Sequence, residues 1–159
     1  MGLTHYPDGI VTDELQIGTP DSSVNYTAAV QALAGKPLAA TIGAPSAEAA
    51  EARTCAVQLK DFAGADLAVR GVVTAFVSTD AAGDTPVDGA TTIALTAGTD
   101  GAVLPGADAG ARAQFVSEAD GDIDIVLTDS AGATGNVYLH IVGPLGNILA
   151  SSAVIAFAA

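Results

Sequence analysis

The sequence contains few of the residue types on which several functional classes depend. Among its 159 residues there is one cysteine, Cys55, there is no tryptophan, and aromatic residues make up 4%. A single cysteine excludes an intrachain disulfide and a cysteine-based metal cluster, and a lone cysteine is usually a small buried hydrophobe. The core must therefore consist of Val, Ile, Leu and Ala, which favours packed sheets over a large enzyme with a deep pocket.

Positive charge is also scarce. Five Lys and Arg oppose eighteen Asp and Glu, a formal net charge of −13. Such a surface repels phosphate, so we expect no nucleic-acid partner. No apolar run reaches the roughly 18 residues that a membrane helix needs. The opening "MGLTHYPDGIV" lacks the basic and apolar regions of a signal peptide, so we expect synthesis in a cytoplasm and no membrane partner.

From Arg53 onward the sequence has short β-like runs separated by turn-forming residues. In "VRGVVTAFVST", for example, Val73, Ala75 and Val77 share one face of the predicted strand and the residues between them share the other. The predicted strands lie within residues 53–61, 69–79, 91–98, 99–106, 112–119, 122–129, 136–143 and 148–157. Seven to eight strands with this turn spacing predict an all-β protein, an antiparallel β-sandwich over residues 53–159.

Residues 1–52 differ from the rest of the chain in composition and pattern. Residues 1–27 mix turn signals such as "HYPDG" with short apolar pieces, and residues 28–52 are dominated by alanine. "SAEAAEA", from Ser46, has a helix N-cap followed by good helix formers, but the glycines and prolines between residues 35 and 45 interrupt any longer helix. We interpret residues 1–52 as an extended N-terminal arm and alanine-rich linker with few large side chains to anchor it.

Four carboxylates, Glu118, Asp120, Asp122 and Asp124, lie within seven residues of the stretch "SEADGDIDIVLTD". Asp120, Asp122 and Asp124 match the first ligand positions of a calcium loop, but Ile125 and Ala131 stand where that loop requires glycine and glutamate. Strand alternation instead places the carboxylates on the face opposite the isoleucines. We therefore interpret the cluster as the solvated face of a strand, with a weak adventitious cation as the alternative.

No catalytic arrangement is apparent in the sequence. His5 and His140 lie in different zones, and His140 in "NVYLHIVG" shares a strand face with Tyr138 and Val142. No serine occupies a G-x-S-x-G motif, and the glycines form neither a phosphate loop nor a dinucleotide fingerprint. We expect no enzyme, no cofactor and no metal.

Several phrases of the sequence occur in a recognisable order: "VQLKDFAG", then "TDGAVL", "SEADGDIDI" and "GNILAS". In this order the chain resembles Ig-like β-sandwich domains in virion proteins of tailed bacteriophages. The opening "THYPDGI" is similar to the N-terminal arm of small capsid-associated phage proteins. The resemblance covers roughly residues 1–18 and 55–157 and leaves the alanine-rich middle unmatched.

The resemblance implies an Ig-like sandwich at the virion surface and no catalytic residues. The leading hypothesis is a capsid decoration (cement) protein on the phage head, a homotrimer whose arm contacts the major capsid protein. The apolar and aromatic residues expected to make this contact are His5, Tyr6, Ile10, Val11, Leu15 and Ile17. These residues could instead pack on their own sandwich. A tail or fibre module for weak host-surface or glycan adhesion is the alternative function, and a cellular or secreted Ig-like adhesin is a third.

Overall fold

The chain divides into two units, Met1–Ala34 and Gly35–Ala159. The computed structural model describes residues 16–17, 24–25, 33–87, 93–105, 111–130 and 135–158. In the first unit, the described backbone forms one antiparallel pair, β1 (Gln16–Ile17) with β2 (Val24–Asn25).

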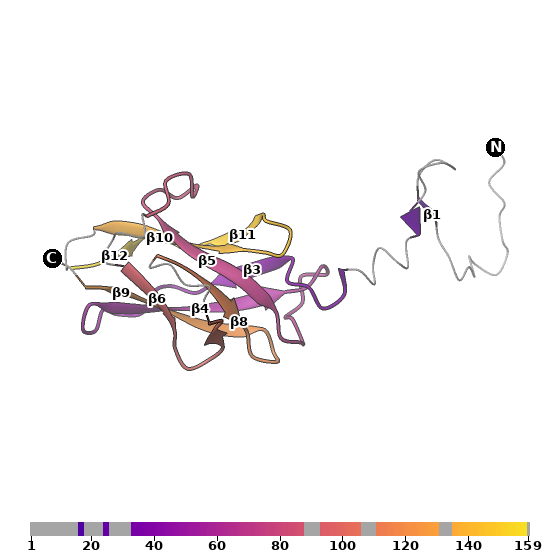
Figure 1. The fold of residues 1–159 in the computed structure, drawn as a ribbon, viewed down its shortest axis with the longest axis horizontal. Coiled ribbons are helices and arrows are strands. Elements are labelled where there is room, and N and C mark those ends of the chain that lie inside the picture. The colour runs from indigo at the N-terminus through magenta and orange to yellow at the C-terminus, as the bar shows by residue number, and fades with distance from the viewer. Residues whose placement is uncertain are drawn as a thin grey trace. The chain divides into compact units, whose positions relative to one another are not determined.

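The second unit is a sandwich of two antiparallel sheets (Figure 1). The four-stranded sheet has the order β3-β4-β9-β6, with β3 (Ala39–Ile42), β4 (Ala52–Lys60), β9 (Asp122–Asp129) and β6 (Ile93–Ala97). The six-stranded sheet has the order β11-β10-β5-β8-β7, and β12 also pairs with β10. Its strands are β11 (Ile148–Ser151), β10 (Asn136–Val142), β5 (Val72–Ser78), β8 (Arg112–Val116), β7 (Ala102–Val103) and β12 (Ile155–Ala156).

Strict alternation along the long strands builds the core. In β9 every second residue is buried, starting from Ile123, while the residues between them are partly exposed. Across the sandwich, Val73, Ala75 and Val77 of β5 are buried in the same way. Side chains that alternate across a pleated strand place all apolar residues of one parity between the sheets. The core is therefore thin and aliphatic, and Phe115 is its largest fully buried side chain.

The structure confirms the predicted all-β sandwich. Each predicted segment contains at least one strand, and β9 has the predicted bounds. Cys55 is fully buried, as predicted, and burial raises the pKa of its thiol to about 11 against a smaller opposing effect of Arg53. The turn-forming residues "PLGN" predict a hairpin, and the structure confirms it: β10 and β11 pair as antiparallel neighbours around this turn, and Gly146 has a positive φ of 81°.

The sandwich begins earlier in the chain than the predicted boundary at residue 52. β3 lies inside the alanine-rich segment and pairs with β4 from Ala39 opposite Lys60 to Ile42 opposite Val57. Ala40 and Ile42 pack against the core. Residues 39–42 are therefore part of the four-stranded sheet, and residues 43–51 connect them to β4. Local composition did not indicate this strand because alanine has a low β propensity, and the strand is held by its partner.

The segment after Ser46, which has a helix N-cap and good helix formers, contains a tight turn instead of a helix. Ala49 and Ala52 bond each other in both directions, and the two residues between them, Ala50 and Glu51, have φ angles of 50° and 62°. Left-handed backbone at both central positions is the geometry of a type I′ hairpin turn, which normally requires Asn or Gly. Pairing with β4 therefore outweighs the helix propensity of "SAEAAEA".

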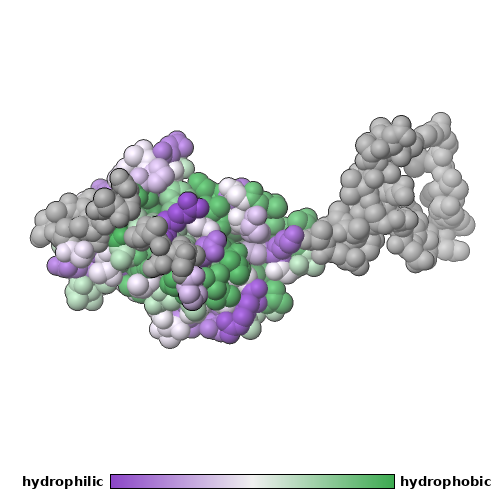
Figure 2. Space-filling model, viewed as in Figure 1, coloured by the Kyte–Doolittle hydropathy of each residue, from purple (hydrophilic) through white to green (hydrophobic). Residues whose placement is uncertain are grey.

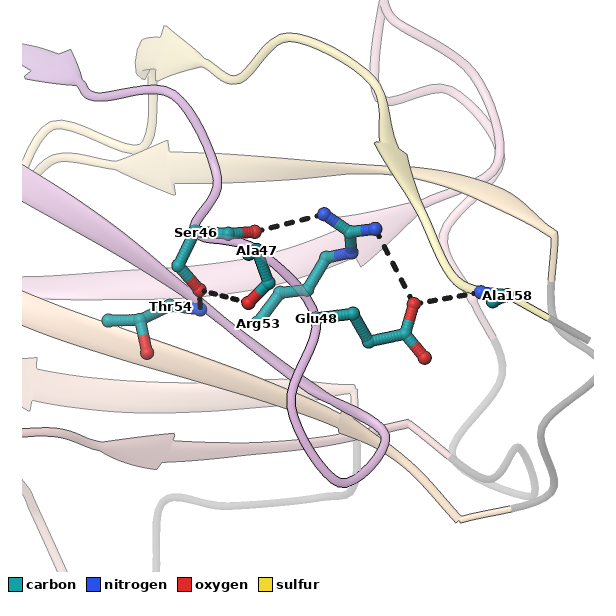
Figure 3. Close-up of polar contacts among 6 residues, drawn as sticks. All are labelled: Ser46, Ala47, Glu48, Arg53, Thr54 and Ala158. Atoms are coloured by element: carbon teal, nitrogen blue, oxygen red, sulfur yellow. Dashed lines mark hydrogen bonds and ion pairs between the residues drawn. The ribbon is translucent and has the colours of Figure 1, made fainter.

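Polar contacts tie this hairpin to the C-terminal end of the sandwich (Figure 3). The Arg53 guanidinium donates to the Ser46 carbonyl at 2.9 Å and contacts Glu48 Oε2 at 3.4 Å. The same Glu48 oxygen accepts the backbone N–H of Ala158 at 2.8 Å. Because these groups are only partly exposed, the contacts fix the hairpin against the last residues of the second unit.

The strained turn generates a stability prediction. The double substitution A50N/E51G places Asn and Gly where the turn has positive φ, and it removes strain of roughly 1–2 kcal/mol per non-glycine residue, less the added freedom of glycine in the unfolded chain. We expect a net gain of about 1 kcal/mol in the free energy of unfolding. Urea denaturation should show a higher midpoint with an unchanged slope. An equal or lower midpoint would contradict the turn assignment.

Candidate functional site

The outer face of the four-stranded sheet is acidic. Asp122 and Asp124 of β9 face outward, opposite the buried Ile123 and Ile125, as predicted for the solvated face of a strand. They line a shallow groove of about 260 Å³ together with Gln58 and Asp100. Gln58 donates to the Asp120 carbonyl and so fixes the turn that precedes β9. No group of described residues has the composition and proximity to hold a metal ion.

The carboxylates of this acidic face repel one another. Burial, followed by the nearby charges of Asp120, Asp100, Asp66 and Asp124, raises the pKa of the Asp122 carboxyl above its ordinary value of 3.8. Ionisation of these carboxylates therefore disfavours the folded state.

The outer face of the six-stranded sheet carries a polar cluster around His140. His140 Nε2 lies 2.7 Å from Ser78 Oγ, and His140 Nδ1 lies 2.8 Å from Ser151 Oγ. The ring stacks on Phe76 with centroids 4.9 Å apart. The loop after β5 covers the ring, because a Cβ placed on Gly83 would lie 3.4 Å from His140 Cε1. His140 and Ser78 are consequently fully buried although they belong to the outward parity of their strands.

The contacts of Ser78 determine the tautomer of this histidine. Ser78 Oγ donates its single proton to the Asp80 carbonyl, so it accepts the second hydrogen bond from His140 Nε2–H. Nδ1 is then the acceptor for the Ser151 hydroxyl. A serine whose proton is committed to a carbonyl, in a site closed to solvent, has no activated oxygen to offer a substrate. The Ser78–His140 pair is therefore a structural contact that holds the loop.

An apolar pocket lies beside this cluster, on the same sheet. Phe76 pairs with His140 on one side and with Arg112 on the other, so the three residues form a row across β10, β5 and β8. The pocket has a volume of about 380 Å³. Among the described residues that line it are Thr74, Phe76, Pro86, Val87, Arg112 and Val142. Figure 2 shows apolar residues exposed over the middle of the face that it draws, interspersed with hydrophilic ones.

The residues predicted to contact a capsid partner fall outside this description. His5, Tyr6, Ile10, Val11 and Leu15 lie outside the described residues, and of Ile17 only the backbone is described, paired with Val24. Sequence reasoning missed the pocket beside Phe76. The only local hint of the pocket was Arg112, a single cation in the alternating run "RAQFV". The rest of the pocket could not be predicted, because it depends on Pro86 and Val87 folding back beside β5.

Comparison with known proteins adds no assignment: no family model, no curated protein and no solved structure matches the chain. Within the described parts of the chain, no helix has the length and apolarity to cross a membrane.

Removing one charge from the acidic face should stabilise the protein. Because the folded-state pKa of Asp122 is raised, its ionisation disfavours the fold at pH values above that pKa, and the penalty disappears as the pH falls below 3.8. We expect Asp122→Asn to raise the free energy of unfolding at neutral pH by roughly 0.2–1 kcal/mol. The gain should vanish in acid. Asp84→Asn, which removes an equal charge from the loop after β5, should give a smaller gain in urea denaturation; equal gains would contradict a local effect.

His140 should make stability fall in mild acid. Burial lowers its pKa below the ordinary value of 6.5, against smaller opposite effects of the Asp80 carbonyl and charge. The stability from a neutral His140 is complete above pH 6.5 and is lost as the pH falls toward the lower pKa of the folded state. In His140→Gln, which keeps a donor and an acceptor, we expect this loss to disappear from thermal melts measured between neutral pH and about pH 5.

The chain offers a matched control for this measurement because it has only two histidines. His5→Gln removes the other imidazole and should leave the acid-dependent loss of stability unchanged. A loss abolished by His5→Gln and retained by His140→Gln would contradict the assignment.

Proposed function

We propose that this chain is a structural virion protein, a capsid decoration protein that binds the outside of a phage head and stabilises it. The observation that carries the proposal is the division of the chain into a closed sandwich, Gly35–Ala159, and a separate N-terminal unit, Met1–Ala34. The sandwich buries one face of each of its sheets in its own core, so we assign attachment to the other unit, which contains the apolar and aromatic residues between His5 and Ile17.

The charge and the buried polar cluster support the same function. A net charge of −13 keeps many closely spaced copies soluble and discourages binding to nucleic acid. Repeated weak contacts of a homotrimer with the major capsid protein add by avidity, so each arm needs only modest affinity. The Ser–His pair that the described residues bring together is closed to solvent, which favours a structural role over catalysis.

A second function, weak adhesion by a tail or fibre module, is favoured by one observation. Phe62, in the turn after β4, is 57% exposed. An exposed aromatic ring in a surface turn can stack on a sugar ring. The two functions differ in where the chain is placed on the particle and in which residues it uses.

The test measures the amount of this chain in purified particles of the phage that encodes it, relative to the major capsid protein, by quantitative mass spectrometry. Decoration predicts a fixed ratio with many copies per particle. Ile10→Asp in the N-terminal unit should then reduce the number of copies on heads at least tenfold, because a buried carboxylate is unfavourable at an apolar contact. Phe62→Ser is the matched control on the sandwich and should leave the copy number unchanged.

Three results would overturn decoration. The first is a few copies per particle together with an adsorption defect in Phe62→Ser, which would establish adhesion instead. The second is unchanged occupancy in Ile10→Asp, and the third is absence of the chain from particles.

A further inference from the structure

The pocket beside Phe76 has the size and lining of a small-molecule site. Its volume of about 380 Å³ lies within the range of roughly 300–1,000 Å³ that is typical of ligand pockets. Two strands supply its base, with Thr74 and Phe76 from β5 and Val142 from β10, and Pro86 and Val87 form a wall. Such a lining favours a ligand with an aliphatic or aromatic group, because the single hydroxyl of Thr74 offers too few polar contacts for a sugar.

Arg112 supplies the one charge among the described residues that line the pocket. Between described residues, the ion pairs are Arg53 with Glu48, Lys60 with Asp66 and Arg70 with Glu118, and none involves Arg112. Arg112 thus has no ionic partner among the described residues, in a chain with eighteen carboxylates and five basic residues. Its planar donors match a carboxylate, with which they form charge-assisted hydrogen bonds.

We propose that this pocket binds a small amphiphilic monocarboxylate, with its apolar body on Phe76 and Val142 and its carboxylate on Arg112. A single negative charge fits best. Arg112 is the one cation among the described residues that line the pocket, so a second negative charge on the ligand would find no partner among them. At physiological ionic strength the Debye length is about 8 Å, so the distant carboxylates of the four-stranded sheet are largely screened while Arg112 acts at contact distance.

The experiment titrates the isotope-labelled full-length chain with sodium octanoate at neutral pH and follows the backbone amide signals by NMR. We expect saturable shifts at Thr74, Phe76 and Arg112. The uncharged analogue 1-octanol should bind about tenfold more weakly, the contribution of one charge-assisted hydrogen bond. Arg112→Gln should lower the affinity for octanoate by a similar factor and leave that for octanol unchanged.

Two further variants distinguish binding at this pocket from general attraction of octanoate to basic residues and from loss of binding through unfolding. Arg70→Gln removes an equal charge from an existing ion pair and should leave octanoate affinity unchanged. Thr74→Tyr, at a half-exposed strand position, fills the pocket and should abolish the binding of both ligands while circular dichroism and melting temperature are retained. No saturable shift at millimolar octanoate, equal losses in Arg112→Gln and Arg70→Gln, or shifts centred on other residues would overturn the proposal. None of these results depends on the proposed role in a virion.

Discussion

Burial of one face of each sheet in a shared aliphatic core is the constraint on which the rest of this structure depends. The chain has no disulfide, and no metal-binding group appears among its described residues, so the order of the second unit comes from apolar burial and antiparallel pairing. Ile123, Ile125 and Leu127 of β9 belong to the same core cluster as Val73, Ala75 and Val77 of β5. A shift of either strand by one residue would place these side chains in water, so the core also fixes the register of the sheets.

The same alternation gives the outer faces their different chemistry. On the four-stranded sheet, the outward residues of β9 are carboxylates that repel one another. On the six-stranded sheet, the outward residues His140, Phe76 and Arg112 form a row that a loop partly covers. Residues of one parity thus form the outer faces, because residues of the other parity hold the fold.

The sequence predicted the elements whose apolar pattern is strong and local. The run from Asp122 to Asp129 alternates without interruption, and its predicted bounds agree with β9. β3 was missed because the pattern of "AATI" is weak and its stability comes from β4, which follows ten residues after Ile42. The helix-forming residues that follow Ser46 form a turn at Ala50 and Glu51 for a related reason: the pairing of the flanking strands outweighs the propensity of the residues in the turn.

By itself the sequence determined the fold class, the solvated character of the acidic stretch and the burial of Cys55, because each follows from side-chain type and a period of two. Only the tertiary structure decided that His140 is buried between two serines, and that Arg112 lies at an apolar pocket. Both depend on the segment from Asp80 to Val87 folding back over β5, a contact between surfaces whose residues carry no local pattern that specifies it.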